Sequence, residues 1–474
     1  MNRYKKLLSN TVLFAIGTFS SKALVFLLMP LYTAVLSTEE YGTVDLIMQA
    51  GNLLLPLVSV GIINAIVRFG LDSSVRKSDV FTVGLMTVFC GFLVLLFFYP
   101  LLQKISYISD NIVLIYLFVL MSCLRSVCHQ FVRSMELVKL YTIDGIFSTF
   151  TTIMFNILFL VVFKLGITGY VLATVCADFL SAFLLFLVAR LHRYIHLKGL
   201  KKHIIVDMLK YAVPMIPNTM FWWITSASDR YIIAFYLGND VNGLYAAASK
   251  IPTIITLFSS IFMDAWQMSA ITEKGTIERN RFFTNVFGTY QALIFAVGSG
   301  LILCSKLLTM IMVSPAYYES WKFIPFLIMA TSFSCLVSFL GSVYMVEKKS
   351  VLNFLTTAAG AVINIVLNFI LIPRLGANGA ALATFASYFT VFLLRAVDTK
   401  RFVKIRFSSL KLALNTILLL IQSLVMIFET PGWIVIEIGI TVLMLLLNLK
   451  SIFESLSRIF FRLRARTVRS KKMS

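Results

Sequence analysis

Fourteen hydrophobic segments, each roughly 18–25 residues long, follow one another along the whole chain with short charged loops between them. A stretch of about 20 apolar residues is long enough to cross the hydrocarbon core of a bilayer as a helix. Only 13% of the residues are charged, whereas soluble domains have about 25%. The sequence therefore predicts an all-α polytopic membrane protein, with no soluble domain between the spans. The predicted spans cover residues 8–36, 43–67, 80–102, 111–132, 146–163, 167–189, 211–237, 243–268, 284–305, 323–346, 352–372, 378–394, 412–428 and 432–449.

The basic residues predict how the chain is oriented in the membrane. If the N-terminus is inside, 33 of the 42 Lys and Arg residues lie in the inner segments. Cytoplasmic loops collect Lys and Arg, so this asymmetry predicts that both termini are cytoplasmic. It also explains the net charge of +21 without a nucleic-acid partner, which we do not expect. The basic tail 451–474 is interpreted as an anchor to anionic lipid, with a docking arm for other proteins as the alternative.

Several other classes of protein do not fit the sequence. The basic N-terminus followed by an apolar run is not a cleaved signal peptide, because the run continues past residue 30 without a cleavage site. The six cysteines all fall within apolar spans without metal-ligand spacing, so neither a disulfide framework nor a metal site is expected. No nucleotide-binding or hydrolase motif is present, and the loops are too short to hold a catalytic domain. We therefore expect no enzyme activity and no cofactor.

An internal repeat divides the spans into two halves. Residues 164–174 read KLGITGYVLAT and residues 374–384 read RLGANGAALAT. A weaker echo relates Glu40-Tyr41-Gly42 before the second span to Asn242-Gly243-Leu244-Tyr245 before the eighth. Six spans separate the members of each pair, so the two halves have the same orientation, as in transporters built from parallel repeats. The predicted domains are 1–200 and 201–407 as two six-helix lobes, 408–450 as two additional helices, and 451–474 as a cytoplasmic tail.

These and other segments resemble those of a known transporter family. They are Glu40-Tyr41-Gly42, Gly61 through Arg68-Phe69, Asp229-Arg230-Tyr231-Ile232, Gly243-Leu244-Tyr245, Ser249-Lys250-Ile251-Pro252 and the run from Arg374 to Ala381. In this order and spacing the chain resembles a polysaccharide (oligosaccharide-lipid) flippase of the multidrug/oligosaccharidyl-lipid/polysaccharide exporter superfamily. The resemblance covers essentially the whole chain and includes the count of fourteen spans.

The resemblance implies a fold and a function. The fold would be two six-helix lobes that form a V and work by alternating access. The function would be export of undecaprenyl-pyrophosphate-linked sugar repeats for capsule, O-antigen or related glycans, in the cytoplasmic membrane of a prokaryote. The implied partners are the lipid-linked oligosaccharide, membrane lipids and other polysaccharide-assembly proteins.

Cations inside the spans are the candidate substrate-binding residues. A lipid-linked pyrophosphate carries about two negative charges, so its carrier needs cations facing a wet cavity, and intramembrane ionisable residues are functional candidates by default. Lys22 and Lys250 are expected to hold the pyrophosphate, with Arg68 and Arg125 guiding its entry. Snorkelling of Lys250 to the surface and a simple end-of-span role for Arg68 are the alternatives. Arg125 forms one predicted stripe with His129 and Arg133, which lines the inner mouth of a cavity or packs against headgroups.

Acidic and aromatic residues in the spans give further candidates. Arg230 is a candidate for substrate binding, and its neighbour Asp229 for the coupling ion; a structural ion pair to another helix is the alternative for both. Asp264 is the second candidate for ion coupling, and Asp45 and Asp178 also lie in spans. Three tryptophans could stack on sugar rings or belong to interfacial aromatic belts: Trp222, Trp223 and Trp266.

Two alternative functions stay open. An ion-coupled multidrug or cation exporter of the same superfamily would favour acidic residues in the cavity and twelve spans, whereas the deep charges here are mostly basic. A membrane scaffold for a glycan-synthesis complex would use the basic tail for docking. The sequence does not name the glycan or the coupling ion.

Overall fold

The computed structural model describes residues 26, 28–72, 74–104, 109–196, 200–272, 276–347, 349–406 and 408–471, without the side chains of 264, 265, 267–278, 452 and 454–471. The described residues form α-helices joined by short 3-10 turns and one π-helical turn, and none of them is in a strand. The helices are α2 (Thr38–Val58), α3 (Ile62–Gly70), α4 (Lys77–Phe97), α5 (Tyr99–Leu102), α6 (Ile112–Ser134), α7 (Val138–Asn156), α8 (Gly166–Val188), α9 (Lys202–Ala212), α10 (Ile216–Leu237), α11 (Asn239–Ala248), α12 (Thr253–Thr272), α13 (Thr276–Leu303), α14 (Ser305–Met312), α15 (Ile324–Val346), α16 (Ser350–Leu375), α17 (Ala377–Asp398), α18 (Ser409–Phe428) and α19 (Trp433–Lys471).

Most of the predicted membrane spans correspond to helices of the structure. Ten helical segments are long and apolar enough to cross a membrane, and two broken pairs, α2 with α3 and α11 with α12, bring the number among the described residues to 12. The first predicted span lies for most of its length outside the described residues, and the seventh corresponds to α10. The prediction of an all-α polytopic membrane protein is confirmed.

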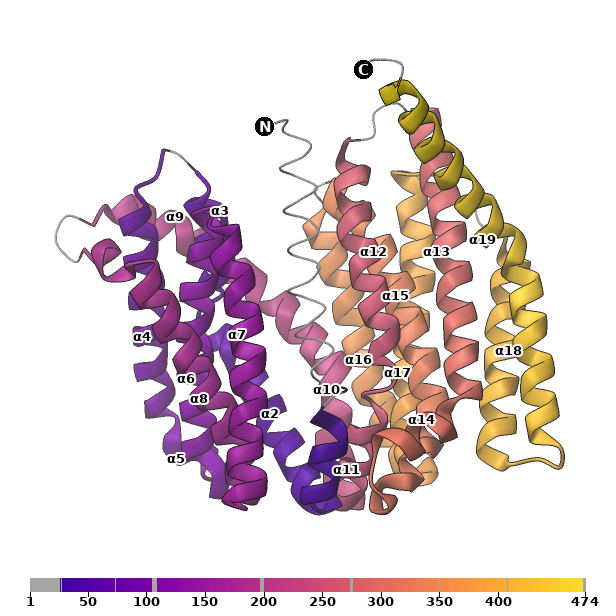
Figure 1. The fold of residues 1–474 in the computed structure, drawn as a ribbon, viewed down its shortest axis with the longest axis horizontal. Helices are drawn as coiled ribbons and strands as arrows, with labels where there is room; N and C mark the ends of the chain where they lie inside the picture. The colour runs from indigo at the N-terminus through magenta and orange to yellow at the C-terminus, as the bar shows by residue number, and fades with distance from the viewer. Residues whose placement is uncertain are drawn as a thin grey trace. The chain divides into compact units, whose positions relative to one another are not determined.

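The described helices pack into two units. Unit 1 comprises residues 1–246 with 312–317, and unit 2 comprises 247–311 with 318–474. In unit 1, α6 packs against α2, α3 and α8, and α7 covers α8 (Figure 1). Its core contains fully buried side chains such as Phe81, Val127 and Phe131. This unit continues past residue 200 and includes α9 and α10. The predicted lobe boundary at residue 200, which rests on the sequence repeat, stays a prediction.

Unit 2 is organised around α15, which is apolar on all sides. This helix packs against α12, α13 and α17, and α16 packs against α17 (Figure 1). A helix that is apolar all round is expected to be buried, and most of α15 is. Helices α18 and α19 pack against each other and both contact α13. The two helices that the sequence places outside the repeat therefore join unit 2 through α13.

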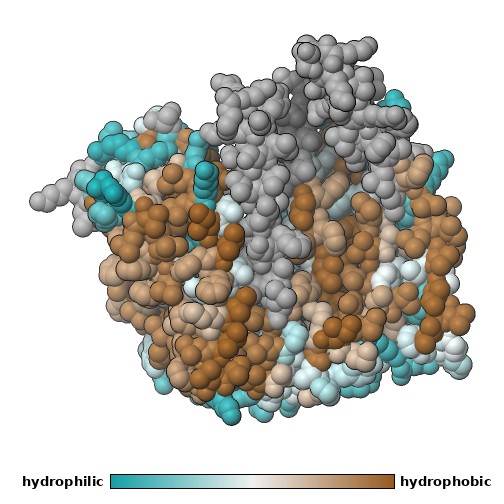
Figure 2. Space-filling model, viewed as in Figure 1, coloured by the Kyte–Doolittle hydropathy of each residue, from teal (hydrophilic) through white to brown (hydrophobic). Residues whose placement is uncertain are grey.

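Apolar side chains cover the outer surface of the helices. The described surface is hydrophobic along the helices and hydrophilic near their ends (Figure 2). Large apolar side chains are exposed in both units, among them Phe97 and Phe150 in unit 1 and Val435 and Val351 in unit 2. In water such patches would be unfavourable, but hydrocarbon solvates them well. The protein is therefore a multi-pass membrane protein.

Candidate functional site

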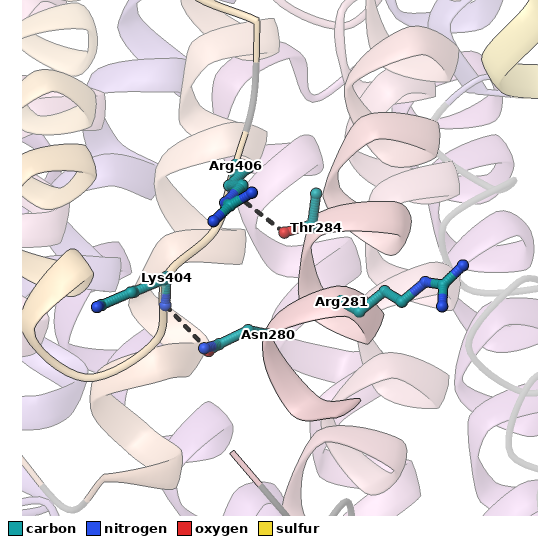
Figure 3. A pocket seen from close by; sticks show the side chains of 5 residues that line it. All are labelled: Asn280, Arg281, Thr284, Lys404 and Arg406. Carbon is teal, nitrogen blue, oxygen red and sulfur yellow. Dashed lines mark hydrogen bonds between the residues drawn. The ribbon is translucent and has the colours of Figure 1, made fainter. Parts of the chain in front are cut away.

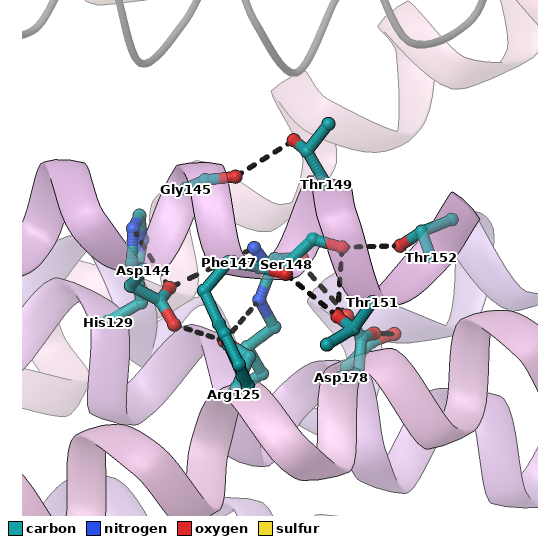
Figure 4. A network of polar contacts seen from close by, with 12 residues as sticks. Arg125, His129, Asp144, Gly145, Phe147, Ser148, Thr149, Thr151, Thr152 and Asp178 are labelled. Atoms are coloured by element: carbon teal, nitrogen blue, oxygen red, sulfur yellow. Dashed lines mark hydrogen bonds and ion pairs between the residues drawn. The ribbon is translucent and has the colours of Figure 1, made fainter. Parts of the chain in front are cut away.

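A polar network lies between three membrane helices of unit 1. Helix α6 contributes Arg125 and, one turn later, His129. Helix α7 contributes Asp144, and α8 contributes Asp178 and Ser181, which are three residues apart and so share a face. Figure 4 shows Arg125 and His129 reaching toward these acidic side chains. Charged residues at this depth are costly unless they are paired, so the network holds these helices in one register.

The guanidinium of Arg125 is the centre of this network. Its NH1 group lies 3.0 Å from Asp178 Oδ1, and its NH2 group lies 3.9 Å from Asp144 Oδ2. Its Nε donates to Ser181 Oγ at 2.9 Å, and that hydroxyl donates to Asp144 Oδ1 at 2.6 Å. The Ser122 hydroxyl of α6 donates to the other oxygen of Asp178. Arg125 therefore contacts both carboxyl groups, directly or through one hydroxyl.

Acidic groups outnumber fixed cations in the network. Asp144 and Asp178 share one guanidinium, and the side chain of Asp144 is fully buried. His129 Nε2 lies 3.5 Å from Asp144 Oδ2, so a protonated imidazole there would supply the missing positive charge. The His129 ring stacks on Tyr141 of α7 at a centroid distance of 4.0 Å. Chemically, the network can take up one proton or one small cation and stay close to neutral.

The predicted basic stripe faces α7. Arg125 and His129 both approach Asp144, and His129 and Arg133 both contact the ring of Tyr141. The four-residue spacing thus predicted the shared face correctly. The role of the stripe at the mouth of a cavity stays a prediction.

A second buried network connects α10 to α2 and α11 within unit 1. Arg230 NH1 lies 2.7 Å from Asp45 Oδ2 of α2, and both side chains are more than nine-tenths buried. The neighbouring Asp229 accepts a hydrogen bond from the Tyr245 hydroxyl of α11 at 2.7 Å. The guanidinium of Arg230 lies over the Tyr245 ring, 5.6 Å from its centroid. The ion pair to a neighbouring helix, which the sequence left open as an alternative, is present.

Two aromatic side chains reinforce the contact between α10 and α2. Trp223 Nε1 donates to the backbone oxygen of Gln49 at 3.0 Å, and the Tyr231 hydroxyl donates to the backbone oxygen of Leu46 at 2.8 Å. Their rings lie 5.8 Å apart. Trp223 thus binds a neighbouring helix, while Trp222 is half-buried.

The weaker sequence echo corresponds to a reciprocal contact between α2 and α11. A Cβ on Gly42 would meet the backbone at Asn239 and Gly243, and a Cβ on Gly243 would meet the backbone at Thr38 and Gly42. Only glycine permits such an approach of two helices. The Asn242 side chain donates to the backbone oxygen of Gly42 at 2.9 Å. The Glu40-Tyr41-Gly42 segment and its echo are therefore both packing elements, and each fits against the other as in a two-fold interface.

The acid of that segment has a local structural role. Glu40 Oε2 accepts from the backbone N–H of Ser37, while Ser37 Oγ accepts from the backbone N–H of Glu40, which is a capping box at the start of α2. It fixes where α2 begins and so where Gly42 meets α11.

The remaining predicted site residues are placed as follows. Lys22 and the side chain of Asp264 lie outside the described part of the chain. Arg68 is exposed in the last turn of α3. Lys250 is half-buried in the break between α11 and α12, next to Pro252, where the backbone leaves the helical pattern. The roles predicted for these residues stay predictions.

Trp266 is buried in the interior of unit 2. Its Nε1 donates to Ser342 Oγ at 2.8 Å. Its ring stacks on Phe339 and on Phe282 at centroid distances of 4.7 and 5.5 Å. A sugar would stack on a face of the Trp266 ring, and in this structure Phe339 and Phe282 stack on that ring.

The sequence did not single out several buried ionisable residues, among them Asp144, Arg395 and Glu437. Asp144 lies two residues before the predicted fifth span, and Arg395 lies one residue after the predicted twelfth, so both were counted with the loops. Glu437 lies inside the last predicted span and is fully buried. A wider margin at the span ends would have found Asp144 and Arg395, and a search for every acid inside a span would have found Glu437. No group of three or more His, Cys, Asp and Glu side chains in the described residues could hold a metal ion.

Comparisons with known proteins identify the family of this sequence and proteins with a similar fold. The sequence of residues 7–266 matches the family described as "Polysaccharide biosynthesis protein". The chain is similar to a structure described as "Lipid II flippase MurJ, inward closed conformation", with a TM-score of 0.70 and 17% identity over 95% of this chain and 99% of that one. It is also similar to an inward-facing multidrug resistance MATE family transporter of the MOP superfamily, with a TM-score of 0.65 and 12% identity over 80% of this chain and 95% of that one.

At these identities the structural similarities establish the fold. No curated protein sequence matches the chain significantly. The family match covers more than half of the chain, and the resemblance drawn from the sequence is confirmed. This protein belongs to the polysaccharide biosynthesis protein family and has the fold of the MOP transporters.

Proposed function

We propose that the protein is a flippase that moves polyprenyl-pyrophosphate-linked oligosaccharide from the inner to the outer leaflet by alternating access. The observation that carries the proposal is the family match over residues 7–266, in a chain with the fold of membrane transporters. The substrate class is undecaprenyl-pyrophosphate-linked repeats for capsule, O-antigen or a related glycan. The proposed location is the cytoplasmic membrane, with both termini in the cytoplasm.

The cations divide into two groups with different proposed roles. Lys22 and Lys250 hold the pyrophosphate, and Arg68 guides it from the inner leaflet. The position of Lys250 in the break between α11 and α12 supports this role, because transporters of this kind form substrate sites at discontinuous helices. Arg125 and Arg230 already pair with acids, so they bind substrate only by exchanging a carboxylate for a phosphate.

The contacts of α2 with α10 and α11 are the proposed closing element. Alternating access requires helices of the two sequence repeats to separate at one end and close at the other. Here the first repeat contributes α2 and the second contributes α10 and α11. The Arg230–Asp45 ion pair and the Gly42–Gly243 approach hold them together. Opening would break these contacts, and a phosphate near Arg230 would offset the loss of Asp45.

The energy source we propose is an ion gradient, aided by the membrane potential. Outward movement of an anion from a negative interior gains about 2.3 kcal/mol per charge per 100 mV. The network of Arg125, Asp144 and Asp178 is the best candidate for the coupling ion, because its acids outnumber its guanidinium. Asp229 and Asp264, the candidates from the sequence, come second, since Asp229 accepts from both Tyr245 and the Arg230 backbone N–H.

The test is the pool of lipid-linked sugars in cells that lack this gene, extracted and identified by mass spectrometry. We expect a complete polyprenyl-pyrophosphate oligosaccharide to accumulate while the surface glycan is lost. Complementation with Lys22→Ala or Lys250→Ala should fail although the variants insert and accumulate. The matched control is Lys104→Ala, which removes an exposed cation from a loop and should restore export.

An unchanged lipid-linked pool with intact surface glycan would refute the flippase. Drug sensitivity of the same cells would then test the multidrug exporter, which the fold accommodates equally well. Export by both single variants and by the double variant would leave the flippase in place and refute the two lysines as its phosphate ligands.

A further inference from the structure

A basic pocket lies in unit 2 where α13 meets the segment between α17 and α18. It is a cavity of about 380 Å³ lined by Asn280, Arg281, Thr284, Lys404 and Arg406 (Figure 3). An adjoining cavity of about 390 Å³ shares Lys404 and Arg406 and adds Lys400 and Ser409. We call this pair of cavities the basic pocket.

The local sequence explains how the pocket is built. In the segment 403–406 apolar and basic residues alternate: Val403 and Ile405 are buried, and Lys404 and Arg406 are exposed. The two buried residues therefore anchor the segment, and the two cations face outward.

Two side chains of α13 hold this segment in place. Asn280 Oδ1 accepts from the backbone N–H of Lys404, and Thr284 Oγ1 accepts from the backbone N–H of Arg406, both at 3.0 Å (Figure 3). Asn280 and Thr284 are one helical turn apart and lie on the same face of α13, so they hold two alternate residues of the segment. The cations are therefore carried on a fixed backbone rather than on a free loop.

The positive charge of the pocket is uncompensated among the described residues. Arg281, Lys400, Lys404 and Arg406 are all exposed, and no carboxylate lines either cavity. The nearby acids are engaged elsewhere, since Glu347 pairs with Arg279 and Asp398 accepts from Tyr344. Cytoplasmic loops are rich in basic residues because these residues set the orientation of the chain in the membrane. Orientation alone does not require the loop backbone to be held at a cavity by side chains of a neighbouring helix. The pocket is suited to an anion.

Its place on the helices points to an anion that carries an apolar tail. The candidate spans Arg279–Leu303, Ala377–Arg401 and Ser409–Phe428 all have an end at the pocket. Val397, three residues before Lys400, and Leu410, the residue after Ser409, are 68% and 70% exposed. A ligand there would meet cations at its head and apolar side chains along its tail. We infer that the basic pocket binds the phosphate headgroup of an anionic membrane phospholipid.

The test compares phospholipid retention by the purified full-length protein and its variants in neutral detergent, using native mass spectrometry and thermal unfolding. The ligands are phosphatidylglycerol, phosphatidylcholine, polyprenyl diphosphate and inorganic phosphate. The variant R281Q/K404Q/R406Q removes the cations of the pocket. The control R193Q/K201Q/K202Q removes three exposed cations from unit 1. We expect the first variant to lose apparent affinity for phosphatidylglycerol by about tenfold or more, and the control to match the wild type.

A second variant separates the pocket from its charge. N280A/T284A keeps every cation but removes the two bonds that hold the 403–406 backbone, so we expect it to retain less phosphatidylglycerol than the wild type at the same net charge. Thermal unfolding without lipid checks that each variant is folded. Equal retention by the wild type and the cation variant, or an equal loss in the control, would overturn the inference. Stabilisation by inorganic phosphate or polyprenyl diphosphate without phosphatidylglycerol would also overturn it.

Discussion

The two units treat their buried charges differently. In unit 1 the buried Arg230 and the half-buried Arg125 face acids from other helices: Arg230 pairs with Asp45, and Arg125 with Asp178. In unit 2 the deeply buried Arg395 of α17 has only neutral partners among the described residues. Its guanidinium donates to the backbone oxygens of Val337 and Asn353 and to the hydroxyls of Thr356 and Thr357.

Glu437 of α19 is the acidic counterpart in unit 2. It is fully buried, and one of its oxygens accepts from Gln422 at 2.8 Å. The other oxygen has no hydrogen-bond partner among the described residues, and no cation there forms an ion pair with it. Ser299 of α13 and Gln422 of α18 are its neighbours. The nearest charged residues with described side chains on these helices are Arg281, 18 residues before Ser299, and Lys411, 11 residues before Gln422. Lys306 of α14 pairs with Glu429.

The difference teaches how each unit tolerates ionisable groups in the membrane. An ion pair between helices is stable only while the helices stay together, so the pairs of unit 1 are suited to hold or release a helix contact. A guanidinium cannot lose its proton, so Arg395 must keep its four acceptors in place. A carboxyl group without a cation is far less costly as the neutral acid, so Glu437 is expected to be protonated.

The largest effect is expected from Arg230→Met. This change leaves Asp45 buried without its cation, which should lower the free energy of unfolding by about 3–5 kcal/mol. The double variant Asp45→Leu with Arg230→Met should recover most of the loss, because it leaves no carboxylate at position 45 without its cation. Unfolding in detergent, followed by the fluorescence of the tryptophans, measures both. The control is Lys322→Met, whose pair with Glu319 is exposed on both sides and which should change stability little. A double variant no more stable than the single one would refute a pairwise role.

A smaller effect is expected from Arg395→Gln. The amide can replace part of the donor set, so the cost should be about 2 kcal/mol from acceptors left unpaired. Since Arg395 pairs with no acid among the described residues, neutralising the nearest one on its helix, Asp398, should not rescue the variant. Rescue by Asp398→Asn would show that Arg395 is paired after all and would remove the contrast between the units.

Near-neutral behaviour is expected from Glu437→Gln. If Glu437 is protonated, the amide resembles it in size and polarity, and the free energy of unfolding at neutral pH should change by about 1 kcal/mol or less. Glu437→Ala is the comparison that removes the bond to Gln422 and leaves a cavity, and it should cost more. A loss from Glu437→Gln as large as that from Arg230→Met would mean that the carboxylate is charged and bound to a cation.

Hydropathy and spacing predicted most of the spans and the shared face of Arg125, His129 and Arg133, because these properties are local along the chain. They could not predict which helices meet. The partner of Arg125 lies 53 residues away in α8, and that of Arg230 lies 185 residues away in α2. Pairing at that separation depends on helix packing, which hydropathy does not encode.

Burial of a particular face was equally beyond the sequence. Tryptophans near the ends of membrane spans are typical of interfacial aromatic belts, yet Trp266 lies against Phe282 and Phe339 in the core of unit 2. Arg395 falls one residue beyond a predicted span and therefore counted as a loop cation, although only 1% of it is exposed. The errors occur at span ends, where one turn decides between headgroups and core.

The smallest effect is expected at an exposed pair, which extends the comparison to the surface of unit 2. Lys306 binds Glu429 in the connection between α18 and α19, and the hydrogen bond and charge of Lys306 lower the pKa of that carboxyl from 4.5. A pKa that is lower in the folded state stabilises the protein above the unfolded value, and this contribution is lost as the pH falls through the folded value. Glu429→Gln should therefore lower the unfolding temperature slightly at neutral pH and leave it unchanged in acid well below pH 4.5. Because the carboxyl is exposed, salt should weaken the effect, unlike that of Arg230→Met. A difference from the wild type that persists in acid would assign the effect to packing of the connection instead of to charge.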